Sequence, residues 1–205
     1  MKAFGNFDKV VASNGGGSSM LEPGGYVAKI VRVKDHTDEK KPYLEFVYDI
    51  WNAEAKSFLF TADLADTTND WKHSFRIYFT GTTDFGKQRY KALIEAVENT
   101  AQGKGAKAFV YEDKDNAEQT LVGKLLGVVI RHRSYVNSEG KVKTAVDVNA
   151  FIPGKDAAEG NFDQKYAEPY EADGVAEARA NAANNVIAAP TEPAIIEVAD
   201  ADIPF

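Results

Sequence analysis

The chain has 205 residues, three histidines, no cysteine and a net charge of −7. This length allows one domain with a sizeable core plus an appendage. A chain without cysteine has no disulfide, iron–sulfur cluster or thiolate zinc site, and three scattered histidines argue against a histidine-based metal site. We also find no run of about 20 apolar residues and no secretory signal pattern, so we expect a cytoplasmic protein without a membrane span.

The charge is divided unevenly along the chain. Residues 156–205 contain two basic and eleven acidic residues, a net charge of −9, whereas residues 1–155 carry +2 and 19 of the 23 aromatic residues. This division predicts a basic binding domain over residues 1–155 and an acidic tail over residues 156–205. The tail is rich in Ala, Glu, Asp, Asn and Pro, which is typical of a disordered linker, and only residues 175–183 have a helical pattern.

In chain order, the first elements expected are strands. Apolar and polar residues alternate over residues 26–34, 43–51 and 71–80, which is the pattern of strands with one buried face. The next segment changes to a helical period, in which apolar residues recur every three or four positions. It predicts a helix over about residues 86–100.

Two further strands are expected near the end of the basic domain. They cover residues 124–136 and 141–152 and are joined by a turn whose residues are typical of a hairpin loop, Asn137-Ser138-Glu139-Gly140. Five strands with a single helix between the third and the fourth predict a mainly β fold. The expected architecture is a five-stranded Greek-key barrel of the OB (oligonucleotide-binding) type, followed by the acidic tail.

The polar faces of these strands combine cations with aromatic rings. A single nucleic-acid strand is bound through cations that contact its phosphates and rings that stack on its bases. The candidate DNA-binding residues are Trp51, Trp71, Lys72, Arg76, Tyr78, Arg131, Arg133, Tyr135, Lys141 and Lys143. Taken singly, each is more simply explained as an ordinary surface or core residue. The alternation from Arg131 to Tyr135, followed by Lys141 and Lys143, favours one shared hairpin face.

The last six residues, Asp-Ala-Asp-Ile-Pro-Phe, combine two acidic side chains with an apolar end. The terminal ring stands beside a free carboxylate, and a partner with an apolar pocket rimmed by Arg or Lys captures both groups. The alternative is a frayed acidic end. We expect this tip to bind partner proteins through Asp200, Asp202, Ile203, Pro204 and Phe205.

The tip, the linker-like tail and the OB-like pattern together resemble single-stranded DNA-binding proteins of bacteria and phages, whose tails commonly end in acidic residues followed by Ile-Pro-Phe. The body resembles the phage-encoded group in the segments Gly25-Tyr26-Val27-Ala28-Lys29-Ile30, Tyr43-Leu44-Glu45-Phe46 and Gly123-Lys124-Leu125-Leu126-Gly127. The resemblance implies coating of single strands during phage DNA replication or recombination in an infected bacterial cell. It also implies recruitment of replication or recombination proteins through the tip, and it leaves open whether the chain forms a homo-oligomer.

One motif points to a different class of protein. Residues 81–87 match the phosphate-loop pattern G-x-x-x-x-G-K between a strand and a helix. However, Gln88 replaces the hydroxyl residue that holds Mg²⁺, Asp84 would bring a carboxylate among the phosphates, and the flanking strands alternate. We therefore expect no cofactor and no catalytic residue. A nucleotide-hydrolysing enzyme using Lys87 remains one alternative, and an acidic-tailed interaction or inhibitor protein that mimics nucleic acid is the other.

Overall fold

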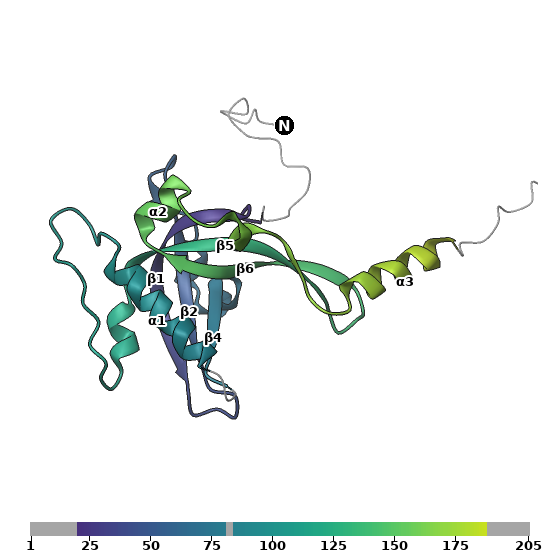
Figure 1. The fold of residues 1–205 in the computed structure, drawn as a ribbon, viewed down its shortest axis with the longest axis horizontal. Coiled ribbons are helices and arrows are strands. Elements are labelled where there is room, and N and C mark those ends of the chain that lie inside the picture. The colour runs from purple at the N-terminus through teal and green to yellow at the C-terminus, as the bar shows by residue number, and fades with distance from the viewer. Residues whose placement is uncertain (1–19, 81–83, 188–205) are drawn as a thin grey trace, which may run out of the picture. The chain divides into compact units, whose positions relative to one another are not determined.

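The computed structural model describes residues 20–80 and 84–187 (Figure 1). In these ranges the strands are β1 (Gly24–His36), β2 (Tyr43–Asn52), β3 (Ser57–Phe58), β4 (Ser74–Tyr78), β5 (Leu125–Val136), β6 (Val142–Ile152) and β7 (Tyr170–Glu171). The α-helices are α1 (Phe85–Glu98), α2 (Gly154–Glu159) and α3 (Val175–Ile187). The chain divides into a first unit, Met1–Arg133 with Ala145–Tyr170, and a second unit, Ser134–Thr144 with Glu171–Phe205.

The fold is mainly β, with an antiparallel sheet that curls into a half-barrel. The strand order is β3-β2-β1-β5-β6, and β4 pairs with β2. The long strands β1, β2, β5 and β6 and the helix α1 lie close to where the sequence pattern predicts them. The third long strand, β4, covers only the middle of the expected range 71–80, and α1 follows it as expected. Among the described strands, β4 pairs with β2 alone, so hydrogen bonds do not close the sheet between β4 and β6.

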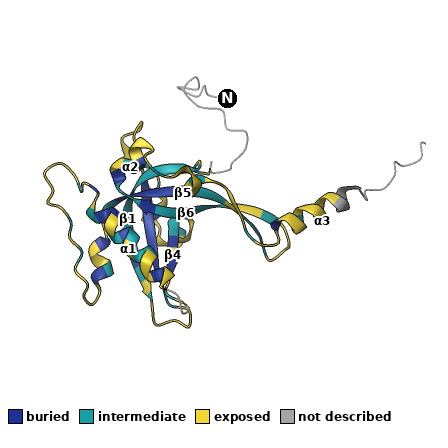
Figure 2. Cartoon of the chain, viewed as in Figure 1, coloured by how far each residue is buried: buried dark blue, intermediate teal, exposed yellow. Residues whose placement is uncertain are grey.

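The core consists of the inward-facing side chains of the strands and one stripe of α1. Ile30, Phe46 and Ile77 are fully buried, as is Leu93 of α1. Phe46 also stacks on Phe75 with ring centroids 5.2 Å apart. Figure 2 shows buried residues, in dark blue, on β1, β2, β4 and β5. This apolar cluster fixes the curl of the sheet and therefore the position of the outward-facing side chains.

Strand β2 is covered on both faces, whereas its alternation predicts one buried face. Glu45 and Asp49, on the polar side, are 5% and 1% exposed. The Asp49 carboxylate accepts hydrogen bonds from the backbone N–H of Phe60 (2.7 Å) and the hydroxyl of Thr61 (2.8 Å). Burial of these carboxylates is tolerated because they are paired, and it ties the segment after β3 to the sheet.

The glycine of the phosphate-loop pattern has a structural role. A Cβ atom on Gly86 would lie 2.0 Å from the backbone oxygen of Tyr78, so only glycine allows α1 to approach β4 this closely. Lys87 is exposed and its ammonium lies 3.2 Å from the Asp84 carboxylate. The first three residues of the motif, 81–83, lie outside the described residues.

The ordered part of the chain extends past the boundary expected at residue 155. Helix α2 packs against β1, and Ala157 is 3% exposed. Two strand glycines make this contact feasible: a Cβ atom on Gly25 would lie 2.7 Å from the Ala157 oxygen, and one on Gly127 would lie 2.7 Å from the Pro153 oxygen. The first unit continues to Tyr170. A segment built from small residues resembles a linker in composition, although here it is packed.

An ion-pair network around the buried Asp70 joins β1 to the 3₁₀ helix Thr67–His73. Asp70 is 1% exposed and accepts hydrogen bonds from Arg32, while the Lys34 ammonium lies 2.8 Å from its carboxylate. Burial alone raises the pKa of Asp70, but the hydrogen bonds from Arg32 and Lys34 outweigh it and hold the pKa below its ordinary value. The folded state is therefore stabilised by the ionised form of this carboxyl group.

We expect Asp70→Asn to lower the free energy of unfolding by about 1–3 kcal/mol at pH 7, because two cations lose a buried partner. Since the folded-state pKa lies below the unfolded value, this stabilisation is present above the ordinary carboxyl pKa and disappears as the pH falls through the folded pKa. The difference between wild type and variant should therefore shrink as the pH falls below the ordinary carboxyl pKa. Urea denaturation at several pH values measures it. Asp38→Asn, in an exposed turn, is the control, and an equal loss in both variants would contradict the expectation.

No helix in the described part of the chain is both long and apolar enough to cross a bilayer.

Candidate nucleic-acid interface

Strand β4 presents the expected cation and ring on its outer face. Phe75 and Ile77 are buried, whereas Arg76 and Tyr78 are exposed, so the predicted alternation is confirmed. Opposite them on β2, Glu45 pairs with Arg76 and Tyr43 with Tyr78.

A hollow of about 310 Å³ in the first unit is bordered by arginines from three elements. We call it the arginine hollow. Its lining is Arg76 and Tyr78 from β4, Phe85, Gly86 and Arg89 from α1, Arg131 from β5, and Asp147, Val148 and Asn149 from β6. Among these described lining residues, three guanidinium groups face a single carboxylate, so the hollow carries an excess of positive charge.

Arg76 is held between a carboxylate and a ring. Its Nε donates to Glu45 over 2.8 Å, and its guanidinium lies 4.9 Å from the centre of the Tyr43 ring. Hydrogen bonds to Tyr78 and Glu45 raise the pKa of Arg76 above its ordinary value. The guanidinium is thus charged and fixed in position, yet its side chain remains 46% exposed and can reach a ligand.

Arg131 is placed in the same manner on β5. Its Nε and Nη2 atoms each donate to the Asp147 carboxylate over 3.0 Å, and its guanidinium lies 4.7 Å from the centre of the Tyr170 ring. A cation stacked on a ring and anchored by one carboxylate loses little freedom when it binds a phosphate.

Arg89 connects α1 to the edge of β6. Its guanidinium donates to the backbone oxygens of Asn149 (2.9 Å) and Val148. Burial lowers the pKa of Arg89, the nearby Asp147 opposes this effect, and Arg131 adds to it. An arginine keeps its charge at neutral pH in such surroundings, so Arg89 contributes positive potential to the hollow.

A row of rings crosses three strands next to the arginine hollow. His36 of β1 stacks on Tyr43 of β2 with centroids 4.5 Å apart and planes at 11°. Tyr43 in turn lies 5.2 Å from Tyr78 of β4. We call these residues the ring row. Sequence reasoning missed His36 and Tyr43, although Tyr43 begins the alternating segment whose polar positions were the signal for the outer face.

Trp51 lies at the end of a strand, as expected, whereas Trp71 does not. Trp71 and Lys72 were expected at the start of a strand, but they belong to the 3₁₀ helix Thr67–His73, which is capped by the Asp66 carboxylate. Trp71 is 70% exposed. Trp51, at the end of β2, packs edge-on against Phe58 with centroids 5.2 Å apart and lines neither the arginine hollow nor the groove described below.

The expected five-residue hairpin face is divided between the two units. Arg131 and Arg133 belong to the first unit, and Tyr135, Lys141 and Lys143 to the second. Lys141 lies in the turn before β6 begins, where its backbone oxygen accepts from the N–H of Asn137. Of the five residues, Arg131 is the one that the described structure brings together with Arg76 and Tyr78.

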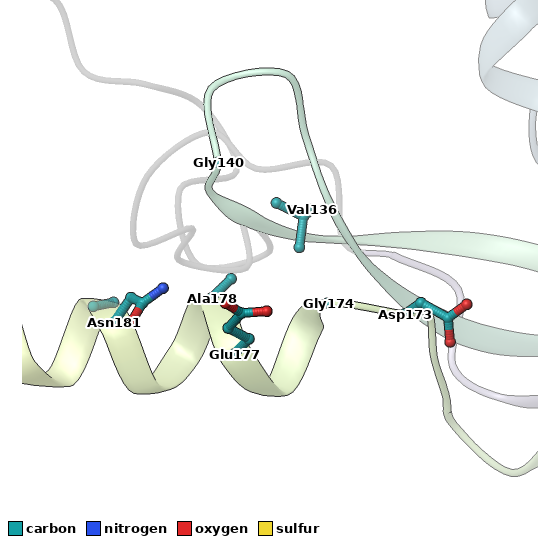
Figure 3. A pocket seen from close by; sticks show the side chains of 8 residues that line it. Val136, Gly140, Asp173, Gly174, Glu177, Ala178 and Asn181 are labelled. Carbon is teal, nitrogen blue, oxygen red and sulfur yellow. The ribbon is translucent and has the colours of Figure 1, made fainter.

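The second unit has a hollow of a different character (Figure 3). It measures about 450 Å³ and lies between the hairpin tip and α3, where Val136 and Ala178 point toward one another. Its lining includes Asp173 and Glu177, and none of the described residues that line it is Lys or Arg. Such a lining repels phosphate. A helical pattern was expected over residues 175–183, and helix α3 runs from Val175 to Ile187.

The acidic tip, with Asp200, Asp202, Ile203, Pro204 and Phe205, lies outside the described residues. Within the described ranges, no three His, Asp or Glu side chains are grouped in a way that could hold a metal ion. Comparisons with protein-family models and with curated protein sequences find no match to this chain.

Proposed function

We propose that this chain is a sequence-tolerant single-stranded DNA-binding protein of the phage type, built on an OB-like barrel, and that it is not an enzyme. The observation that carries the proposal is the arginine hollow lying next to the ring row on one side of the half-barrel. The half-barrel, with α1 between the third and fourth long strands, supports the OB-like assignment.

The arginine hollow and the ring row bind different parts of a single strand in this proposal. The arginines provide the charge that phosphates require, and this part of the free energy depends on salt. The ring row offers flat surfaces to bases, and each stacked base contributes about 1–3 kcal/mol whatever its identity. Because neither contact reads a base edge, binding tolerates sequence. The proposed role is to coat and protect single strands in phage replication or recombination, in the cytoplasm of the infected cell.

The acidic tip recruits replication or recombination proteins in this proposal. Its support is the sequence, since the −9 of residues 156–205 contrasts with the +2 of residues 1–155. The same charge supports the competing function, a protein that mimics nucleic acid and binds none.

A mobility-shift assay at low salt tests the proposal. A labelled single strand should be shifted, and a duplex of the same length should be shifted much less, because its bases cannot stack on the protein. The affinity should fall with salt at a slope of about −0.7 per neutralised phosphate. A single strand that is left unshifted at low salt would favour the nucleic-acid mimic instead.

A further inference from the structure

A second hollow of the first unit borders β4 at the end opposite the arginine hollow. It measures about 490 Å³, and we call it the tryptophan groove. Trp71 forms one side, and apolar side chains that include Leu21, Tyr48, Phe60 and Val146 form much of the remainder. Trp71 keeps 70% of its surface exposed although it borders an apolar groove. An indole in this setting offers a free face on which a flat ligand can stack.

The charged side chains at the tryptophan groove include both signs. Lys72 contributes an ammonium 5.9 Å from the Trp71 ring centre, and Asp63 contributes a carboxylate that lies 3.0 Å from Nε2 of His73. His73 is itself stacked on Phe60, with centroids 3.9 Å apart. One cation and one anion on apolar walls suit an uncharged ring. The arginine hollow, with its excess of guanidinium groups, suits a phosphate.

Strands β4 and β6 connect the two hollows. Ser74 lines the groove, and Arg76, two residues further along β4, lines the arginine hollow. On β6, Val146 lines the groove and Asp147 the arginine hollow. Two residues of a strand span about 7 Å, so a ligand that follows these strands meets the neutral, apolar site and the cationic site in succession.

We propose that the tryptophan groove holds one unpaired nucleobase stacked on Trp71, while the arginine hollow binds a neighbouring phosphate of the same strand. This inference rests on the proposed function and adds to it a discrete base-binding site. A paired base is stacked inside a duplex and cannot enter the groove, so the groove also provides the preference for single strands.

Trp71 itself reports on the groove. In a Trp51→Phe variant, Trp71 is the one remaining tryptophan of the sequence, and its emission can be followed as the protein is titrated with oligo-dT. We expect quenching that saturates with binding. An abasic strand with the same number of phosphates should bind more weakly and leave the emission nearly unchanged, because it has phosphates but no base to stack.

Substitutions of Trp71 test how much the stacking contact contributes to the binding free energy. Trp71→Ala should weaken oligo-dT binding by about tenfold or more, the range of one lost stacking contact, while affinity for the abasic strand stays the same. Trp71→Phe keeps a ring and should retain most of the affinity. Because Trp71 is exposed, both variants should fold, and circular dichroism checks this. Tyr166→Ala, which removes an exposed ring that lines neither the arginine hollow nor the tryptophan groove, is the matched control.

The outcomes separate this inference from the proposed function. If neither strand binds, the proposed function fails and this inference fails with it. If oligo-dT binds while Trp71 emission and the Trp71→Ala affinity stay unchanged, the base site is overturned and single-strand binding stands. If deletion of residues 190–205 changes Trp71 emission without DNA, and oligo-dT then has no further effect, the occupant is the chain's own acidic tip and the inference is overturned.

Discussion

A double variant, Arg76→Gln with Arg131→Gln, is expected to lose about 100-fold in affinity for a single strand at low salt. Each substitution removes one charge-assisted phosphate contact of about 1.5 kcal/mol. The slope of log affinity against log salt should also become shallower by about 1.4, because two phosphates are no longer neutralised. Glutamine is chosen because its amide can still donate to Glu45 or Asp147, the anchoring carboxylates. Fluorescence titration over a series of salt concentrations measures both effects.

The matched control removes two lysines from exposed helix surfaces. Lys91 of α1 and Lys155 of α2 each lie near a carboxylate four residues on, as the two arginines lie near theirs, but neither lines the arginine hollow. The variant Lys91→Gln with Lys155→Gln loses the same charge and should keep most of the salt slope. If both double variants lose equal affinity, general charge rather than the hollow explains binding.

The hairpin lysines give a third comparison. The sequence pattern assigns Lys141 and Lys143 to the same face as Arg131, whereas the structure places them in the other unit. Lys141→Gln with Lys143→Gln therefore measures whether the hairpin tip contacts DNA. A loss equal to that of the arginine pair would show that the hairpin prediction was correct and that the path of the strand extends beyond the hollow.

Deletion of residues 190–205 is expected to tighten single-strand binding at low salt and to abolish partner recruitment. The deleted segment carries four acidic residues and no basic one, and these compete with phosphates for the cations of residues 1–155. The gain should disappear as salt rises, because the competition is screened. Titration of full-length and shortened protein with fluorescent oligo-dT measures the change.

A charge-preserving control separates the two roles of the deleted segment. Phe205→Ala with Ile203→Ala keeps every carboxylate and removes the apolar anchors. It should bind DNA like the full-length chain and fail to recruit partners, as measured by co-purification with replication proteins from infected cells. If the deletion leaves DNA affinity unchanged at low salt, the tail does not compete with DNA.

The strands and α1 were predictable because each presents an apolar face to the core. Alternation in residues 43–51 and a helical stripe in residues 86–100 are direct consequences of burial against a single core. Prediction failed where a different interaction dominates. The segment before β4 alternates like a strand, but the Asp66 carboxylate caps a 3₁₀ helix there, and the strand begins only at Ser74.

The packing of α2 was not predictable from composition. Its contacts depend on small residues in both partners, and small residues give no apolar periodicity. The available signal was the pair of glycines, Gly25 and Gly127, inside predicted strands, since glycine in a strand marks a close approach of another segment. Residues 156–170 therefore resembled a linker although they belong to the first unit.

Only part of the candidate site could be predicted from local patterns in the sequence. Arg76, Tyr78 and Arg131 lie on polar strand faces, which alternation reveals. Arg89 lies on a helix, and its neighbours depend on how far the sheet curls and which strand edge meets α1. The meeting of β4, α1 and β6 at one hollow is a property of the whole fold, and no local pattern in the chain contains it.

The hydrogen bonds of Arg89 bear on whether β6 can pair with a strand of another molecule. An exposed strand edge is a template on which another chain can extend a sheet, and natural proteins commonly block such edges with charged side chains. Arg89 donates to the carbonyl oxygens of Val148 and Asn149, consecutive residues of β6 whose carbonyls point to opposite sides of a regular strand, so one of them lies toward the edge that does not pair with β5. A charged side chain held against β6 is therefore expected to oppose the pairing of this strand with a strand of another molecule.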